Sequence, residues 1–226
     1  MSGRELRTEW QRRNERRQSI DRNRWYLAAL LAIALIASQV TAIAAPTEGA
    51  WSTDAAHTEI NFSVKHFFTP VTGSFEDYEI DLDYNAEHPE SSSVEARIKV
   101  ASINTGNEKR DNHLRSGDWF EADKHPYITF KSTSVRRDGD NGLVASGPLT
   151  IKGKSQQVEL PIRLLGKQMI PEQMQQMLGG TKEVASFQAS TAVDRGDFGV
   201  GVGNWAATMV VGSEVNIEIL LEAHNR

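Results

Sequence analysis

Apolar and polar residues alternate with a period of two through most of the chain beyond residue 57, and this pattern constrains the fold more than any other feature. In residues 58–65, for example, Ile60, Phe62 and Val64 are each separated by one polar residue. Because successive side chains of a β-strand point to opposite faces, such alternation predicts strands with one buried face. The pattern predicts strands at Thr58–Lys65, Tyr78–Tyr84, Ser93–Val100, Tyr127–Ser132, Leu143–Ile151, Gln157–Leu165, Phe187–Val193 and Glu214–Glu222.

Turn and helix signals lie between some of these strands. Residues 138–142 (Asp-Gly-Asp-Asn-Gly) and 152–154 (Lys-Gly-Lys) each predict a hairpin turn, because glycine and its polar neighbours accept the backbone angles of tight turns. Residues 107–116 are polar and compatible with a short helix. Residues 171–178 favour a second helix, with Pro171 at its first position and two glycines after its end.

A chain of 226 residues with 39% apolar residues suits one globular domain. Antiparallel strands that each have one apolar face bury it either in a sandwich of two sheets or in a closed barrel. Closure removes the exposed edges of the sheet, and a barrel of eight strands is wide enough to be filled by side chains or to hold one slender ligand. The alternation therefore predicts an all-β fold and leaves sandwich and barrel open.

The first 45 residues differ in composition from the rest. Residues 1–24 hold eight Arg and four acidic residues, and residues 25–45 hold no charged residue. We interpret residues 1–24 as a basic, cytoplasmic n-region and residues 25–44 as a signal peptide or an uncleaved membrane anchor. The strictly apolar run from Leu27 to Ala37 has the length of a signal-peptide core, and Ala42-Ile43-Ala44 is a small-x-small cleavage pattern. Both interpretations predict export, and cleavage would leave a chain that begins at Ala45.

Charge and composition exclude several classes of function. Outside residues 1–24 the chain has 17 basic and 26 acidic residues of its total of 25 and 30, which argues against a nucleic-acid partner. It has no cysteine and no Gly-x-Ser-x-Gly motif, so a cysteine nucleophile and a serine hydrolase elbow are absent. The glycines at 199, 201 and 203 lack the strand-to-helix setting of a phosphate loop and predict a bend beside Trp205. His57 and His66 flank one predicted strand at opposite ends, so we expect no metal site from them.

Pieces of sequence spread over residues 51–224 resemble the YceI-like family. The most specific piece is Arg110-Asp111-Asn112-His113-Leu114-Arg115-Ser116, followed by Asp118-Trp119-Phe120, in which Trp119 stands where the family usually has Phe. The other pieces are Asp54-Ala55-Ala56-His57-Thr58, Ile60–His66, Val71–Phe75, Ser102–Thr105, Tyr127–Phe130, Gly147–Gly153, Arg195–Gly199 and Glu222-Ala223.

The resemblance implies a single closed antiparallel β-barrel of about eight strands, lipocalin-like, with short helical insertions, over residues 51–225. It also implies a secreted or periplasmic protein that performs no catalysis and needs no cofactor. Its partner would be an isoprenoid lipid or an isoprenoid quinone, which it would sequester or carry in the barrel interior; association with a membrane is a further expectation. The predicted cavity-lining residues are Phe62, Val64, Phe75, Ile98, Trp119, Phe120, Phe130, Leu149, Ile151, Val158, Leu160, Phe187, Val193 and Phe198.

A polar cluster within the most specific piece has two interpretations. Arg110, His113 and Arg115 would contact a lipid head group, since arginine donates readily to phosphate and carbonyl oxygens. Alternatively, the cluster ties a short helix to the barrel rim, which is the interpretation we favour. An alternative function, an enzyme acting on a small lipidic substrate, would use Asp111 and His113 as an acid–base pair. A third function is a structural or stress-related envelope protein with a filled barrel.

Residues 167–182 form an insertion that contains Met169, Met174 and Met177. Methionine is flexible and apolar, so these side chains would either close the cavity mouth as a lid or pack the insertion against the barrel.

Overall fold

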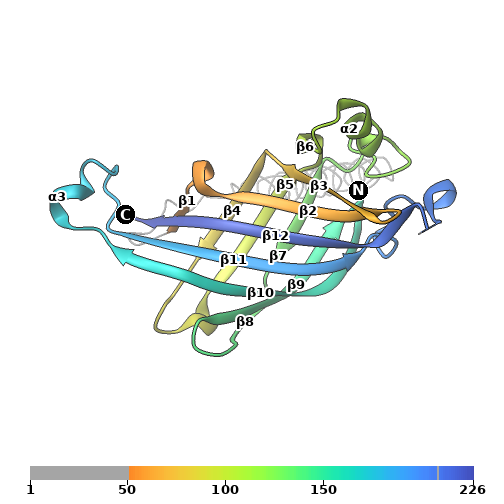
Figure 1. Cartoon of the computed structure of the whole chain (residues 1–226). Coiled ribbons are helices and arrows are strands. Elements are labelled where there is room, and N and C mark those ends of the chain that lie inside the picture. Colours follow the sequence, from red (N-terminus) through yellow and green to blue (C-terminus); the bar gives the residue numbers. More distant parts are fainter. Residues whose placement is uncertain (1–50, 208) are drawn as a thin grey trace, which may run out of the picture. The chain divides into compact units, whose positions relative to one another are not determined.

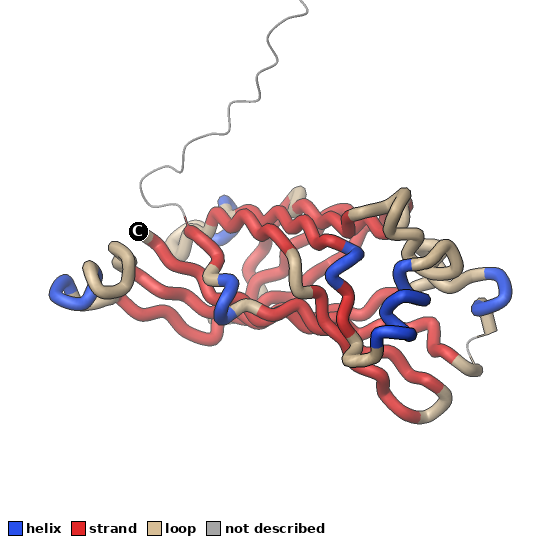
Figure 2. The backbone as a smooth tube through the Cα atoms, turned by 90° about the horizontal axis from the view of Figure 1, so that it is seen from above, coloured by secondary structure: helices blue, strands red, loops and turns tan. Residues whose placement is uncertain are grey.

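A computed structural model describes residues 51–207 and 209–226. The predicted basic segment 1–24 and the predicted signal or anchor segment 25–44 lie outside the described residues. Strands dominate the described part (Figures 1 and 2). They are β1 (Trp51–Thr53), β2 (Glu59–His66), β3 (Thr69–Phe75), β4 (Tyr78–Asp83), β5 (Ser93–Lys99), β6 (Ile103–Asn104), β7 (Tyr127–Lys131), β8 (Ser134–Arg137), β9 (Gly142–Ile151), β10 (Lys154–Met169), β11 (Glu183–Asp194) and β12 (Val211–Asn225).

Eight of these strands close into a ring. The order of hydrogen-bonded neighbours is β1–β4–β5–β7–β9–β10–β11–β12, and β12 pairs back onto β1. Each pairing in the ring is antiparallel. The predicted closed antiparallel barrel of about eight strands is therefore confirmed, and the alternative of an open two-sheet sandwich is wrong.

Three further strands widen the wall at one end. β12 pairs with β1 through Ala223–Asn225 and with β2 through Val211–Leu220, so two successive segments of the chain share one side of this strand. β3 pairs with β2, and β6 pairs with β3. β2 thus continues the line of β1, β3 continues that of β4, and β6 continues that of β5. A short connection separates the two strands of each pair. β8 pairs with β9 beside the ring.

The predicted turns are present. β8 and β9 are joined by residues 138–141, where the amide of Asp138 donates to the carbonyl of Gly142 at 2.8 Å. β9 and β10 are joined by Lys152 and Gly153, which both have positive φ angles, 49° and 72°. Two central residues with positive φ define a type I′ turn, whose twist matches that of the flanking strands.

Helices are few and short. The described helices are α2 (Glu108–Arg115) and α3 (Glu172–Gln175), and the 3₁₀ turns are η1 (Ala55–His57), η2 (Pro89–Ser91), η3 (Val100–Ser102) and η4 (Gly203–Trp205). α2 confirms the helix predicted at 107–116; the Asn107 side chain caps it by accepting from the amide of Arg110 at 3.0 Å. α3 is shorter than predicted, because residues 176–180 form a turn, in which Gly179 and Gly180 take positive φ; Pro171 is its N-cap residue, not its first helical residue. Within the described residues, no helix has the length and apolar character to cross a membrane.

The two helices mark opposite ends of the barrel. In Figure 1, α2 covers the end at which β3 and β6 extend the wall, and α3 lies beyond the far ends of β10 and β11. The apolar core extends between these ends. Its larger part includes Ile60, Val100, Ile103 and Phe198, and a smaller cluster of Ala185, Phe187, Leu221 and Ala223 lies toward α3.

Candidate functional site

The barrel encloses a cavity of about 220 Å³. Its wall is contributed by inward positions of the ring strands and of β2 and β3, together with the segment around Trp119, and almost all of these positions are aliphatic or aromatic. Along β11 the lining runs from Phe187 to Arg195, the residue after the strand; these eight steps span about 26 Å at roughly 3.3 Å per residue. Because barrel strands tilt by about 40°, the cavity extends about 20 Å along the barrel axis. This volume is small for that length, so the cavity is a narrow channel.

All fourteen residues predicted to line a cavity do line it: Phe62, Val64, Phe75, Ile98, Trp119, Phe120, Phe130, Leu149, Ile151, Val158, Leu160, Phe187, Val193 and Phe198. Their exposure differs around the wall. Phe130, Leu149 and Ile151, on β7 and β9, are buried, whereas Val158 and Val193, on the neighbouring strands β10 and β11, are only half-buried although they line the cavity. An inward side chain that is not fully covered has no neighbour across the barrel, so the interior is incompletely filled. That these residues contact a ligand stays a prediction.

Several lining residues were not predicted. Ile217 and Ile219 of β12 line the cavity and continue the alternation of a strand that the sequence already predicted. Arg195 also lines it and is 5% exposed. It follows Phe187, Ala189, Thr191 and Val193 at steps of two, so extending the alternation of β11 by one position would have placed it inside.

Arg195 closes one end of the cavity. Its Nε donates to the carbonyl of Gly212 at 2.9 Å, and its Nη atoms donate to four further backbone carbonyls. These four acceptors are the carbonyls of Val200, Gly201, Trp205 and Val211. A guanidinium has five N–H donors, so the side chain is fully satisfied without a carboxylate. Burial lowers the pKa of Arg195, and the charge of nearby Asp194 opposes that effect.

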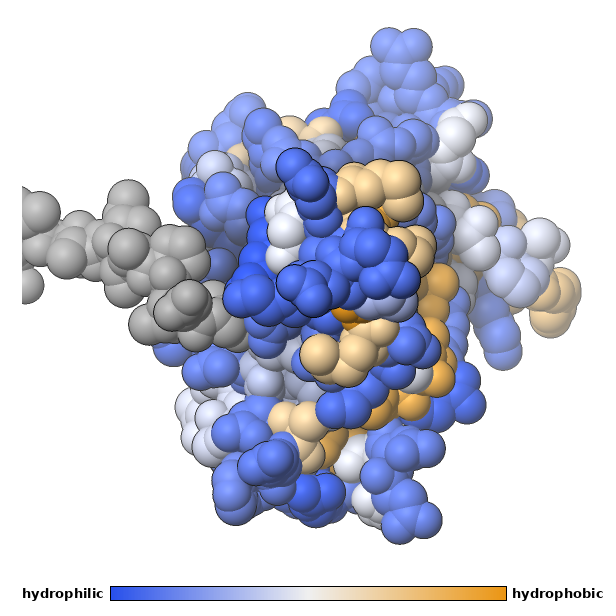
Figure 3. All heavy atoms as spheres, turned by 90° about the vertical axis from the view of Figure 1, so that its left-hand side faces the viewer, coloured by the Kyte–Doolittle hydropathy of each residue, from blue (hydrophilic) through white to orange (hydrophobic). Residues whose placement is uncertain are grey.

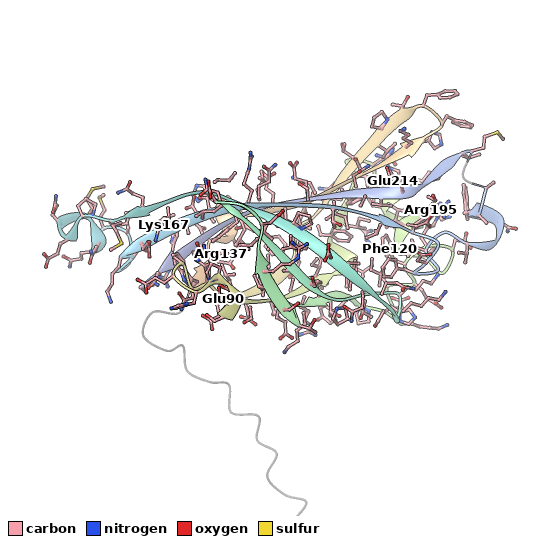
Figure 4. The ribbon with its side chains drawn as sticks, turned by 90° about the horizontal axis from the view of Figure 1, so that it is seen from below. Glu90, Phe120, Arg137, Lys167, Arg195 and Glu214 are labelled. Carbon is pink, nitrogen blue, oxygen red and sulfur yellow. The ribbon has the colours of Figure 1, made fainter. Side chains whose placement is uncertain are left out.

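Aromatic rings pack around this arginine. The guanidinium carbon lies 5.4 Å from the ring centroid of Trp119, and the Trp119 ring lies 5.8 Å from that of Trp205. The Trp119 indole nitrogen is buried without a hydrogen-bond partner in the described part of the chain. In Figure 4, Arg195 and Phe120 lie toward the same end of the molecule, whereas Glu90, Arg137 and Lys167 lie toward the other. The α2 end of the cavity is therefore sealed by rings and one arginine.

The predicted polar cluster lies outside the cavity. None of Arg110, Asp111, His113 and Arg115 belongs to the lining. Arg110 donates to the hydroxyl and carbonyl oxygens of Thr105 at 2.7 and 2.8 Å. Arg115 donates to the carbonyls of Ala101 and Ile103 and to the side chain of Asn112 at 2.8–3.1 Å. Both guanidinium groups are thus occupied in holding α2 to the β5–β6 segment, as the structural interpretation predicts.

Asp111 and His113 do not form the acid–base pair that the enzyme alternative requires. Asp111 is 6% exposed, and its Oδ1 accepts from the amide and the hydroxyl of Thr105. His113 Nε2 instead lies 3.2 Å from Asp118 Oδ2. The two residues are two positions apart on a helix and point in different directions, so the pairing predicted from their proximity in sequence is wrong.

The methionines of residues 167–182 do not cover the cavity, but the end of this segment contacts the barrel: Thr181 is buried, and the amide of Lys182 donates to the carbonyl of Asn225 at 2.8 Å. Met169, Met174 and Met177 are 61%, 40% and 74% exposed and are not among the lining residues. The strands β10 and β11 instead carry α3 beyond the ring, where hydrophobic patches lie among hydrophilic surface (Figure 3). A lid of methionines over the cavity is therefore wrong; the insertion is tied to the barrel at its C-terminal end, while its methionines stay exposed.

The comparison with known protein families is decisive. The YceI-like domain matches residues 51–223, which is more than half of the chain. The chain belongs to the YceI-like family. A UPF0312 protein of Pectobacterium atrosepticum is 32% identical over 175 residues, covering 77% of this chain and 85% of that protein.

Solved structures agree with this assignment. BcnA of Burkholderia cenocepacia superposes with a TM-score of 0.68 at 26% identity, covering 76% of this chain and 99% of that one. A polyisoprenoid binding domain from Saccharophagus degradans superposes with a TM-score of 0.57 at 16% identity, covering 79% of this chain and 99% of that one. This YceI-like chain therefore shares its barrel with proteins of different sequence, and the family resemblance seen in the sequence is confirmed.

Proposed function

We propose that this barrel binds the hydrocarbon chain of an isoprenoid lipid or isoprenoid quinone in its interior and performs no chemistry on it. The observation that carries the proposal is the narrow apolar cavity of about 220 Å³ inside a closed barrel. The fold is shared with a domain described as polyisoprenoid binding, which supports the same class of ligand. A chain without polar atoms suits a cavity that offers few polar partners.

Energetics favour recognition of the tail over recognition of the head group. Each buried CH₂ contributes roughly 0.8 kcal/mol, so affinity should rise with each carbon that enters the cavity. Once a tail fills a cavity about 20 Å long, further carbons remain in water and add nothing. We therefore expect affinity to increase with tail length and then to level off, with little dependence on the head group.

A titration tests this dependence. Delipidated full-length protein is titrated with short-, medium- and long-tailed isoprenoids that share one head group, and then with one tail carrying different head groups. Native mass spectrometry of gently purified protein shows in parallel whether a lipid is retained. Affinity that is equal for all tail lengths, or absent for all of them, would contradict the proposal.

Two neighbouring positions on β12 offer a matched pair of variants. Ile217 lines the cavity and is half-buried, whereas Asn216 is exposed on the outer face. Ile217→Asp places a carboxylate in the cavity and should weaken tail binding by at least about tenfold, because a buried charge is costly next to hydrocarbon. Asn216→Asp adds the same charge outside and should leave binding unchanged. The sequence-based choice Ile151→Asp is less suitable, since Ile151 is fully buried and its replacement would also cost stability.

We also propose that the barrel acts in the periplasm. This part of the proposal rests on the Arg-rich and uncharged segments at 1–24 and 25–44, which predict export. N-terminal sequencing of the protein from its native host tests it: a start at Ala45 supports a cleaved signal, and a start at Met1 or Ser2 on membrane-bound protein establishes an anchor. Soluble cytoplasmic protein with an intact start would contradict export.

A further inference from the structure

Four ionisable side chains meet on the outer face of the barrel, where the first and last strands pair. Asp54 and His57 come from the η1 segment that follows β1. Glu222 and His224 come from β12, two positions apart and therefore on the same face. Their neighbours Leu221 and Ala223 belong to the buried core, so Glu222 and His224 point outward. We call these four residues the seam cluster.

The backbone holds the two halves of the seam cluster together. The amide of Asp54 donates to the carbonyl of Glu222 at 2.9 Å, and β1 pairs with the end of β12 at Ser52 and His224. The Asp54 Oδ1 atom accepts from the amide of Ala56 at 2.9 Å, which fixes the carboxylate and leaves Oδ2 facing the histidines. The cluster is thus a built arrangement on two rigid segments.

The candidate ligand atoms of the seam cluster lie close together. His57 Nδ1 lies 2.8 Å from Asp54 Oδ2 and 3.9 Å from Glu222 Oε1. His224 Nε2 lies 3.0 Å from Glu222 Oε1 and 3.7 Å from Asp54 Oδ2. The ligand atoms of Asp54, His57 and Glu222 all lie within 4.8 Å of one another. Tetrahedral zinc with bonds of about 2.0–2.2 Å keeps its ligand atoms about 3.3–3.6 Å apart. The four separations given above lie on both sides of this range and depart from it by at most 0.5 Å. Asp54, His57 and Glu222 form the compact three-ligand group, and His224 adjoins it through Asp54 and Glu222.

Charge and access also suit a cation. With both imidazoles neutral, the seam cluster holds two carboxylates and no positive charge, and like charges this close repel each other. The cluster lines a surface depression of about 480 Å³, whose wall also includes Thr181 and Arg226. The His57 side chain is 67% exposed, and those of Asp54, Glu222 and His224 are 20–28% exposed. An ion can therefore reach the ligand atoms from solvent.

We propose that the seam cluster binds a divalent transition-metal ion of the zinc type, with His57 Nδ1, Asp54 Oδ2, Glu222 Oε1 and His224 Nε2 as ligands. Imidazole nitrogen suits zinc and its neighbours, whereas Ca²⁺ and Mg²⁺ prefer sets of oxygen ligands. The nitrogen of each histidine that binds the ion carries no proton, so a neutral imidazole at this site keeps its single proton on the other ring nitrogen. The site revises our expectation of no metal site, because that expectation paired His57 with His66, whereas the fold brings His57 to Glu222 and His224 to Asp54.

The location gives the ion a function in the fold. In the ring, β1 pairs with β12 through three residues and with β4 through two. An ion held by residues of η1 and β12 would fasten this short closure, because it binds only when the two segments are together. The site lies on the outside of the wall, so its effect on stability is independent of the lipid proposed for the interior.

Zinc binding to the full-length protein tests the proposal. Chelator-treated protein is titrated with Zn²⁺ by calorimetry, and Co²⁺ serves as a spectroscopic probe, since its visible absorption is intense in tetrahedral and weak in octahedral sites. We expect one ion per chain and a melting temperature raised by about 5–10 °C when free Zn²⁺ is 100-fold above Kd. Ca²⁺ and Mg²⁺ at the same concentrations should produce no shift.

Variants separate this site from adventitious binding. His57→Gln and His224→Gln should each weaken Zn²⁺ binding by about 100-fold. His57 is exposed, so its replacement should not disturb folding, and a thermal melt without zinc tests this. The matched control is His88→Gln, because His88 also lies beside one acid, 3.4 Å from Glu90, but outside the cluster. Loss of binding in the two cluster variants alone supports the site. Absent binding, or equal binding in all variants, overturns it and leaves a network of ion pairs.

Discussion

Replacement of Arg195 tests the account of how the barrel end is closed. The guanidinium is buried, and its five donors end on the carbonyls of Val200, Gly201, Trp205, Val211 and Gly212. We consider Arg195→Met, which keeps an unbranched apolar side chain beside Trp119 but removes the donors and the charge. If the hydrogen bonds hold the end together, this variant must lose stability although it buries no charge.

The expected loss of stability in Arg195→Met follows from the backbone carbonyls that lose their hydrogen-bond donors. The bonds to the carbonyls of Val200 and Gly201 are buried, and an unsatisfied buried acceptor costs about 1–3 kcal/mol, which gives about 2–6 kcal/mol for the two. The other three carbonyls are partly buried and can turn to water. Release from the cost of burying a charge offsets part of the loss. We expect a net loss of about 3 kcal/mol, and hence a melting temperature lower by about 6–12 °C for a domain of this size.

Thermal and urea unfolding followed by circular dichroism measure this loss. Arg195→Lys should fall between the wild type and Arg195→Met, since lysine supplies three donors from one point and cannot reach all five acceptors. Arg163→Met is the matched control: Arg163 is exposed on β10 and donates to Gln188 at 2.7 Å, so its loss should cost less than about 0.5 kcal/mol. Wild-type stability of Arg195→Met would refute the reasoning, because the carbonyls would then need no donor.

Three further predictions concern other parts of the chain. Arg115→Ala should lower the melting temperature, and any loss of lipid affinity should be no larger than the loss of folded protein. Thermal melts and lipid titrations on the same sample measure both, and reduced affinity at unchanged stability would instead support the head-group role. Gly201→Ala should destabilise by about 1–3 kcal/mol in urea unfolding, because Gly201 has a φ of 60° and a Cβ would lie 2.6 Å from the Trp119 ring. Burial, and secondarily the charge of Glu59, raises the pKa of Tyr78 above 10.0. The stability that this tyrosine contributes is therefore complete below pH 10 and is lost as the pH rises further. Between pH 9 and 11 the melting temperature of Tyr78→Phe should fall less than that of the wild type.

The alternation of residues predicted seven of the eight ring strands, all except β1, and it also predicted β2, because a period of two is a local property. The strands that it missed carry local signals against a strand or are too short to show a pattern. β3 contains Pro70 and Gly73, both of which are unfavourable within strands. Gly73 is required by a contact that is remote in sequence: a Cβ there would lie 2.5 Å from the ring of Phe62. No local pattern reveals such a close approach, and the choice between sandwich and barrel likewise depends on the pairing of β1 with β12.

The candidate site likewise contains some residues that the sequence could predict and others that it could not. Residues such as Phe62 and Val193 could be placed inside by parity alone, once a closed barrel was expected. Parity also places Arg195 inside, but a charged residue conventionally ends a buried run, so the predicted strand ends at Val193. Three of the carbonyls that satisfy Arg195, those of Val200, Gly201 and Trp205, come from a loop whose path no periodicity describes. For the same reason, the approach of His57 to Glu222, 165 positions apart, could not be predicted.

The pairing of Trp51 with Asn225 has a consequence for the order in which the barrel can be connected. The two ends of the domain are neighbours in the wall, so a short linker can join them without moving any strand. A circularly permuted chain that is joined there and opened at the exposed residues 138–141 between β8 and β9 would retain each pairing of the ring. In such a chain β12 would run directly into β1 as the middle of one continuous polypeptide. The barrel is then defined by its closed circle of strand pairs, and the strand at which the domain begins is one choice among several.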